Sequence, residues 1–158
     1  MTGGAAFSRD GRYRYRLWRR WDRSRPTIAF CMLNPSTADA SRDDPTIRRC
    51  IGFARDWGYG GIEVVNIFGL RATDPRDLRS AHDPVGPRND AFMLRAAALS
   101  PVVIAWGVHG ALRGRGAEAL SLLATRTRLL ALGRTRSGAP RHPLYLRRDA
   151  DAMEYVLA

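Results

Sequence analysis

The stretch Thr27–Thr37, TIAFCMLNPST, is the part of the sequence around which the fold is expected to form. Its first half, Ile28–Leu33, is an apolar run typical of a strand that is buried on both faces of a sheet. The run stops at Asn34-Pro35-Ser36. Ligands of open α/β sheets bind outside the carboxyl ends of the strands, so Asn34 is a candidate for chemistry. Asn-Pro is also an ordinary turn signal, and both interpretations stand at this point.

Three further apolar runs predict core strands, and the segments between them predict helices. The strands are expected at Ile62–Phe68, Pro101–Trp106 and Arg128–Leu132. The helices are expected after the cap Asp44-Pro45, over residues 86–99 and 114–125, and over 149–157. Strands that alternate with helices predict an α/β fold: a mostly parallel sheet of four core strands, with helices on both faces.

The N-terminal region is expected to add one edge strand to this sheet. Residues 1–10 are expected to be flexible, and residues 11–158 to form a single α/β domain. In Arg12–Trp21, RYRYRLWRRW, aromatic residues alternate with arginines, which predicts a strand with one apolar and one basic face. The basic face is either a solvated edge that resists edge pairing or a surface for nucleic acid.

The charge of the chain favours a polyanionic partner. The formal net charge is +11, from 26 arginines and no lysine against 15 acidic residues. Guanidinium groups suit phosphates and stack on bases, so DNA or a nucleotide is the expected partner. A genome that favours Arg codons would explain the absence of Lys, but not the excess of basic over acidic residues.

Other features limit the class of protein. The sequence has no apolar run near the roughly 20 residues that cross a bilayer, and its first residues lack an apolar signal core, so a cytoplasmic protein without a membrane partner is expected. Cys31 and Cys50 stand in apolar contexts and are expected to be buried thiols. Because the sequence has neither a cluster with metal-ligand spacing nor a phosphate-binding glycine motif, we expect no metal and no cofactor. The oligomeric state is left open.

Polar residues follow each predicted core strand, and a parallel sheet would gather them at one edge. They include Asn34, Asn66, His109 and His142. An Asn that holds water and a His that donates to a leaving group suit hydrolysis without a covalent intermediate. If the leaving group is a nucleobase, the His offsets the negative charge that develops on it.

Several alternatives to this assignment stay open. Ser36 is expected to cap a helix or contact a phosphate rather than act as a nucleophile. Asp39 is a weaker acid/base candidate. His82 and His109 are alternatives to His142, or loop residues without a role.

Long motifs carry a resemblance to a known family. They are LNPSTAD, DPTIRRC, FARDWGYGG, VVNIF, RATDP, GPRND, AWG and GAPRHPLYL. Over nearly its whole length the chain resembles the bacterial domain-of-unknown-function family 1643, which supplies no established activity.

The layout is also similar, more remotely, to the uracil-DNA glycosylase superfamily. There an apolar strand ends in Gly-Ile-Asn-Pro-Gly, and FCMLNPS stands in that place here. The resemblance implies that Asn34 positions water, that Asn66 reads the base edge and that His142 polarises the base. It also implies a three-layer α/β/α sandwich and hydrolysis of the N-glycosidic bond of a nucleobase in DNA or in a nucleotide.

The expected site extends to neighbouring residues, and the sequence departs from the glycosylase pattern in places. Substrate contacts are expected from Pro35, Ser36 and Tyr145, and phosphate or nucleic-acid contacts from Arg12, Arg14, Arg136 and Arg141. Met32 replaces a glycine, Leu144 replaces the serine after His-Pro, and the four cysteines of an iron–sulfur cluster are absent. Two other functions remain: a non-catalytic module that binds nucleic acid or nucleotides, and a hydrolase or transferase acting on a small phosphorylated ligand.

Overall fold

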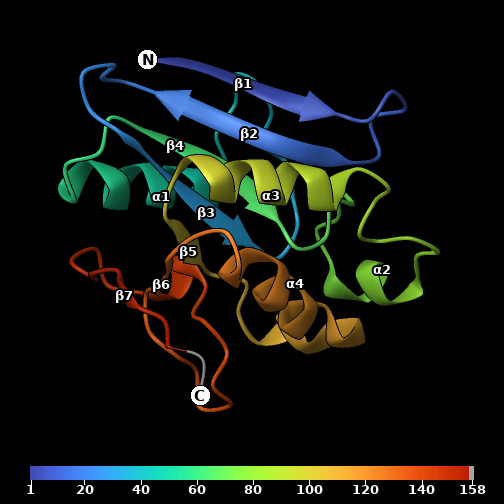
Figure 1. The fold of residues 1–158 in the computed structure, drawn as a ribbon. Helices are drawn as coiled ribbons and strands as arrows, with labels where there is room; N and C mark the ends of the chain where they lie inside the picture. The colour runs from blue at the N-terminus through green and yellow to red at the C-terminus, as the bar shows by residue number, and fades with distance from the viewer. Residues whose placement is uncertain (157–158) are drawn as a thin grey trace.

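Strand β3, Thr27–Met32, lies in the middle of a seven-stranded sheet in the computed structural model, which describes residues 1–156 (Figure 1). The strand order is β1-β2-β4-β3-β5-β6-β7. Strand β3 pairs in parallel with β4, Gly61–Asn66, and with β5, Val102–Ile104. Strand β5 pairs in parallel with β6, Leu129–Ala131. The four apolar runs therefore form strands that point the same way.

The sheet as a whole is mixed, so the expectation of a mostly parallel sheet of four core strands with one edge strand is wrong. Strand β2, Arg14–Arg20, pairs antiparallel with both β1, Thr2–Phe7, and β4. Strand β7, Met153–Glu154, pairs antiparallel with β6. The strand expected at the edge is therefore an interior strand, and its arginines do not all face solvent.

Strand β1 occupies the segment that was expected to be flexible. Its sequence, TGGAAF, is poor in the β-branched residues that favour strands, so propensity gives no signal. Its pairing depends on close approach to β2: a Cβ atom added to Gly4 would lie 2.5 Å from the indole Nε1 of Trp18. The two glycines of this strand leave room for the side chains of the neighbouring strand.

The C-terminal segment also differs from expectation. Residues 149–157 were expected to form a helix, but the described part contains strand β7; residue 157 lies outside the described residues. The backbone N–H of Tyr155 donates to the carbonyl of Leu129, and the guanidinium of Arg134 lies 4.0 Å from the centre of the Tyr155 ring. These contacts tie the segment to the edge of β6.

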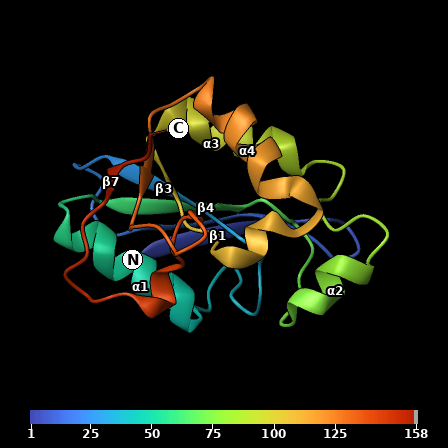
Figure 2. The same cartoon turned by 90° about the horizontal axis from the view of Figure 1, so that it is seen from below.

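Helices cover both faces of the sheet (Figure 2). Helix α1, Pro45–Asp56, begins at the predicted cap, where the Asp44 carboxylate accepts a hydrogen bond from the Ile47 N–H at 2.9 Å. It packs on one face, and the other carries α3, Asn89–Leu99, and α4, Arg115–Ala124. Three short helical segments also occur in the described chain. They are α2, Pro75–Ser80, between β4 and α3, and the 3-10 helices η1, Val108–Gly114, and η2, Pro143–Tyr145.

The helices of the described residues are too short or too polar to cross a bilayer.

Candidate functional site

The carboxyl ends of β3 and β4 lie side by side, because Met32 and Asn66 are paired in the register of these strands. Asn34 follows β3 by two residues, and Asn66 is the last residue of β4. Strand β2 runs the opposite way, so its first residue, Arg14, lies at this same edge of the sheet. His142, immediately before η2, joins them from the C-terminal part of the chain.

These side chains line a small inner cavity of about 40 Å³. The set brings together the predicted Asn34, Asn66, Ser36, Arg14 and His142. Its other walls are Met32, Asp44, Thr46 and Ile47, from the end of β3 and the beginning of α1. Met32 is 3% exposed and narrows the cavity at the position where the glycosylase pattern has glycine. The inner cavity has room for a few water molecules or one small polar group, but not for a nucleobase.

The amide of Asn34 is held by the backbone. Its Nδ2 donates to the carbonyl oxygens of Ala72 at 2.7 Å and of Pro35 at 3.0 Å. The Ala72 N–H in turn donates to the Pro35 carbonyl, which joins the end of β3 to the loop before α2. Because the amide nitrogen is engaged, Asn34 offers its carbonyl oxygen to a ligand. Pro35 itself is buried, and its backbone oxygen accepts the hydrogen bond from Asn34.

Asn66 is buried, with 2% of its surface exposed, and its Nδ2 has no hydrogen-bond partner within the described chain. Its backbone carbonyl accepts a bond from the Asn89 side chain at 2.7 Å, which fixes the end of β4. A buried amide that lacks a partner is costly, because it has lost water without gaining a protein acceptor. Asn66 therefore presents an amide donor that a ligand in the inner cavity can satisfy.

Arg14 is also 2% exposed. Its Nη1 donates to the Ala38 carbonyl at 3.0 Å, while its Nε has no partner in residues 1–156. Burial lowers the pKa of this guanidinium to about 10, although the nearby negative charge of Asp44 acts in the opposite direction. The side chain remains positively charged at neutral pH. Arg14 was expected on an exposed surface, but it is buried against the loop that contains Ala38 and lines the inner cavity.

The hydrogen bond and burial of His142 favour a neutral ring that can donate from Nε2. Its Nδ1 accepts a hydrogen bond from the backbone N–H of Leu144 at 3.2 Å, so the proton of the neutral ring is on Nε2. Burial lowers the pKa of His142, and the charge of Asp44 opposes this shift. The ring is therefore uncharged at pH 7 and donates from Nε2.

A larger outer groove, of about 360 Å³, is also lined by His142. Its wall includes the predicted Arg141 and Tyr145, and the alternative histidine, His109. Trp106 follows β5 and is 4% exposed, whereas Tyr145 is 81% exposed. The remaining walls are Gly107, Val108 and Thr135. Trp106 and Thr135 were not among the candidates. Trp106 is the last residue of the apolar run 101–106, so its place at a strand end was a signal that could have found it.

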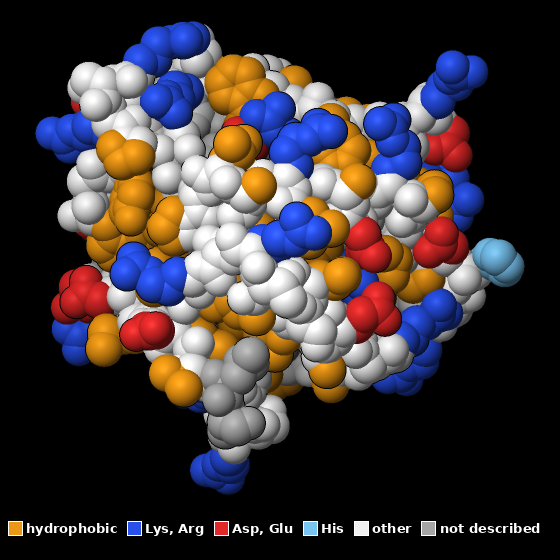
Figure 3. Space-filling view, viewed as in Figure 1, with side chains coloured by type: hydrophobic (Ala, Val, Ile, Leu, Met, Phe, Trp, Pro, Cys, Tyr) orange, Lys and Arg blue, Asp and Glu red, His pale blue; other side chains and the backbone are white. Residues whose placement is uncertain are grey.

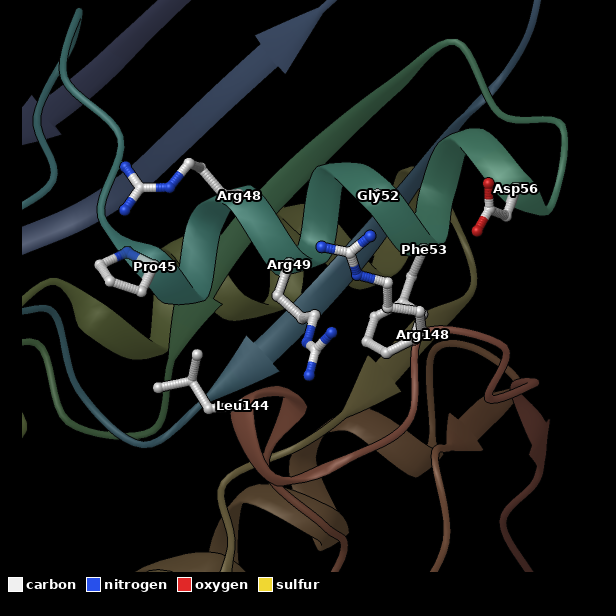
Figure 4. Close-up of a pocket in the computed structure, with 8 residues that line it drawn as sticks. All are labelled: Pro45, Arg48, Arg49, Gly52, Phe53, Asp56, Leu144 and Arg148. Atoms are coloured by element: carbon white, nitrogen blue, oxygen red, sulfur yellow. The ribbon is translucent and has the colours of Figure 1, made fainter.

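A third depression, of about 570 Å³, follows the outer face of α1 (Figure 4). Arg48 and Arg49 extend from the helix, and Leu144 and Arg148 approach from the segment around η2. The Arg49 Nη2 donates to the Leu146 carbonyl at 2.6 Å, which fixes that segment against α1. We call this depression the α1 groove. On the face of the molecule that Figure 3 shows, the basic side chains are spread out, with carboxylates between them.

Some sequence candidates lie away from these sites. Arg12 and Arg136 are exposed and line neither the inner cavity nor the outer groove. The Asp39 carboxylate accepts from the backbone N–H groups of Ser41 and Arg42, and these bonds lower its pKa, so it stabilises a turn. His82 is exposed after α2. Residues 1–156 hold no group of three or more His, Cys, Asp or Glu placed to bind a metal.

Comparison with known proteins identifies one family. The profile of a family described as a protein of unknown function (DUF1643) matches residues 14–144 of the 158. Neither a curated protein nor a solved structure matches the chain. The remote likeness to uracil-DNA glycosylases, in sequence and in fold, therefore has no support from these comparisons.

Proposed function

The chain belongs to the DUF1643 family of proteins of unknown function, and we propose that it hydrolyses the N-glycosidic bond between a nucleobase and its sugar, in a nucleotide or in DNA. One observation carries the proposal. His142, whose ring is neutral, lines both the inner cavity, together with Asn34 and Asn66, and the outer groove, together with Trp106 and Tyr145. This arrangement suits a ligand with a polar part and an aromatic part joined near His142.

The sizes of the two spaces decide which part of the ligand each receives. The outer groove, at about 360 Å³, falls within the usual range of small-molecule sites, and aromatic walls suit a nucleobase. The inner cavity, at about 40 Å³, is too small for a base. The base would therefore lie in the outer groove, and the sugar and its substituents would point inward.

The proposed reaction needs no covalent intermediate. The bond between C1′ and the base nitrogen breaks, and its electron pair leaves with the base. Nε2–H of His142 donates to the base and stabilises this charge. The Asn34 carbonyl oxygen holds the water that adds to C1′. That water loses a proton to solvent, and the departing base gains one. The unpartnered amide of Asn66 supports a polar group of the sugar side.

The test is release of free base, measured by chromatography. The substrates are free deoxynucleotides and single- or double-stranded oligonucleotides carrying uracil, hypoxanthine or mismatched thymine. Replacing His142 by Gln or Asn34 by Ala should lower the rate about 10²-fold or more. His82→Gln is the matched control because His82 is exposed outside both sites. Absence of free base from every substrate would show that the proposal is wrong.

A second candidate function, binding of nucleic acid without catalysis, is favoured by the α1 groove, where three arginines line one depression (Figure 4). Two of them, Arg48 and Arg148, are exposed. Replacing both by Gln should weaken DNA binding and reduce the slope of log K against log salt by about 2. The control pair Arg126→Gln and Arg128→Gln removes the same charge from another exposed site. Equal effects of the two pairs would reject the α1 groove as the binding surface.

A further inference from the structure

Three arginine side chains are buried, and they differ in how their charge is compensated. Arg19 donates to the Asp43 carboxylate at 2.8 Å and to several carbonyls. Arg115 donates to Glu118 and Asp90, each at 2.6 Å. The side chain of Arg14 is less well compensated. Within residues 1–156 it makes one hydrogen bond, to the Ala38 carbonyl, and has no carboxylate within 4.0 Å. The charge of Asp44 acts on Arg14 from the same cavity without bonding to it, so Arg14 is compensated less completely than the other two arginines. An anion from outside would complete the compensation of this buried charge.

Other donors surround the same space. The Nδ2 of Asn66 is buried and unpartnered, and two hydroxyl-bearing residues, Ser36 and Thr46, also line the inner cavity. Thr46 is the second residue of α1, a helix of 12 residues. The first N–H groups of a helix have no partner within the helix, and its positive end favours an anion. Two buried unpartnered donors and a helix N-terminus thus meet in one small cavity.

We propose that the inner cavity binds the terminal phosphate of a small phosphorylated ligand, between the guanidinium of Arg14, the amide of Asn66 and the beginning of α1. Its volume of about 40 Å³ admits one compact anionic group. A phosphate within a DNA strand carries sugars on both sides and does not fit such a space. The proposal deepens the proposed function, since it assigns a free nucleotide as the substrate, but the phosphate site itself does not depend on hydrolysis.

Asp44 provides a direct control on this assignment. Its carboxylate caps α1 and also lines the inner cavity, so its negative charge opposes a bound phosphate. Asn caps helices as well as Asp does. Asp44→Asn therefore keeps the helix cap and removes the opposing charge, and phosphate binding should become stronger.

The experiment measures binding by calorimetry at constant ionic strength, which keeps general screening fixed. The probes are inorganic phosphate, a nucleoside 5′-monophosphate and the matching nucleoside. Phosphate should bind saturably, and the monophosphate should bind at least about tenfold more tightly than the nucleoside. Arg14→Gln should weaken phosphate binding at least about tenfold. Arg12→Gln, which removes a nearby exposed charge, should leave it unchanged. Asp44→Asn should strengthen it about threefold.

The outcomes separate the two proposals. If Arg14→Gln does not fold, Asp44→Asn and the comparison of nucleotide with nucleoside decide. The phosphate site is rejected if phosphate binding does not saturate, or if neither Arg14→Gln nor Asp44→Asn changes it. Saturable phosphate binding without release of base would support the site and overturn the proposed hydrolysis. Release of base from oligonucleotides, with equal binding of nucleotide and nucleoside, would overturn the phosphate site and leave hydrolysis standing.

Discussion

Asn34 has a structural task that can be tested separately from any role in chemistry. Its amide donates to the carbonyls of Ala72 and Pro35. Asn34→Ala should lower the free energy of unfolding by about 1–2 kcal/mol, because these bonds are lost. Asn34→Asp should cost more, since a carboxylate would face two carbonyl oxygens. Urea unfolding measures both. An Asp variant as stable as the wild type would show that the amide does not hold this loop.

His142 should remain neutral to a lower pH than an ordinary histidine. Burial lowers its pKa below 6.5, so the folded state binds fewer protons than the unfolded state as the pH falls through 6.5. The stability that this group contributes is fully present above pH 6.5 and is lost as the pH falls through the lowered pKa. An NMR titration of the ring, assigned with His142→Gln, checks this. A midpoint at or above 6.5 would contradict the lowered pKa of His142.

At the scale of the elements, the beginning of α1 depends on Asp44. Removing the bond from the Ile47 N–H in Asp44→Ala should cost about 1 kcal/mol of unfolding free energy, whereas Asp44→Asn should cost only a few tenths. Thermal and urea unfolding of the two variants give the comparison. Equal losses in both would mean that the charge of Asp44, rather than its capping bond, stabilises the helix.

Replacing glycine by alanine should have opposite effects on stability at two positions. Gly4→Ala places a methyl group 2.5 Å from the Trp18 ring across the β1–β2 pair, and should destabilise the protein by about 1–3 kcal/mol. Gly52 lies within α1 with open space around its Cβ position, so Gly52→Ala should stabilise by about 0.5–1 kcal/mol. The measurement is urea unfolding. A neutral Gly4→Ala would show that β1 is held loosely on the sheet.

Some of these elements could be predicted from the sequence, and others could not. The parallel strands and α1 are encoded locally, by the apolar run before Asn34 and by the cap at Asp44. Strand β1 has no such signal in its own residues. It forms because its glycines let it lie close to Trp18 of β2, and residue propensity does not indicate this. The meeting of Asn34, Asn66 and His142 followed from parallel strands. The burial of Arg14 did not, since it depends on the antiparallel register of β2, which the pattern of arginines and aromatics leaves open.

For the whole molecule, two buried thiols in the described core can be used to detect separation of the helices from the sheet. Cys31 packs between the sheet and the α3–α4 layer, and Cys50 packs between the sheet and α1. Burial raises the pKa of Cys31 to about 12 and also raises that of Cys50, so almost no thiolate exists in the folded protein. Alkylating reagents, which attack thiolates, therefore react only after a layer separates from the sheet.

The rates of labelling would show whether the two layers separate together. Met32 and Cys50 touch through their sulfur atoms, 3.7 Å apart, and β3 carries residues that pack into both layers. We expect Cys31→Ala and Cys50→Ala, each with one remaining thiol, to be alkylated at rates within about threefold, as in cooperative unfolding. Mass spectrometry over time measures this. Much faster labelling of Cys50 would mean that α1 lifts from the sheet on its own, opening the inner cavity without unfolding the rest of the protein.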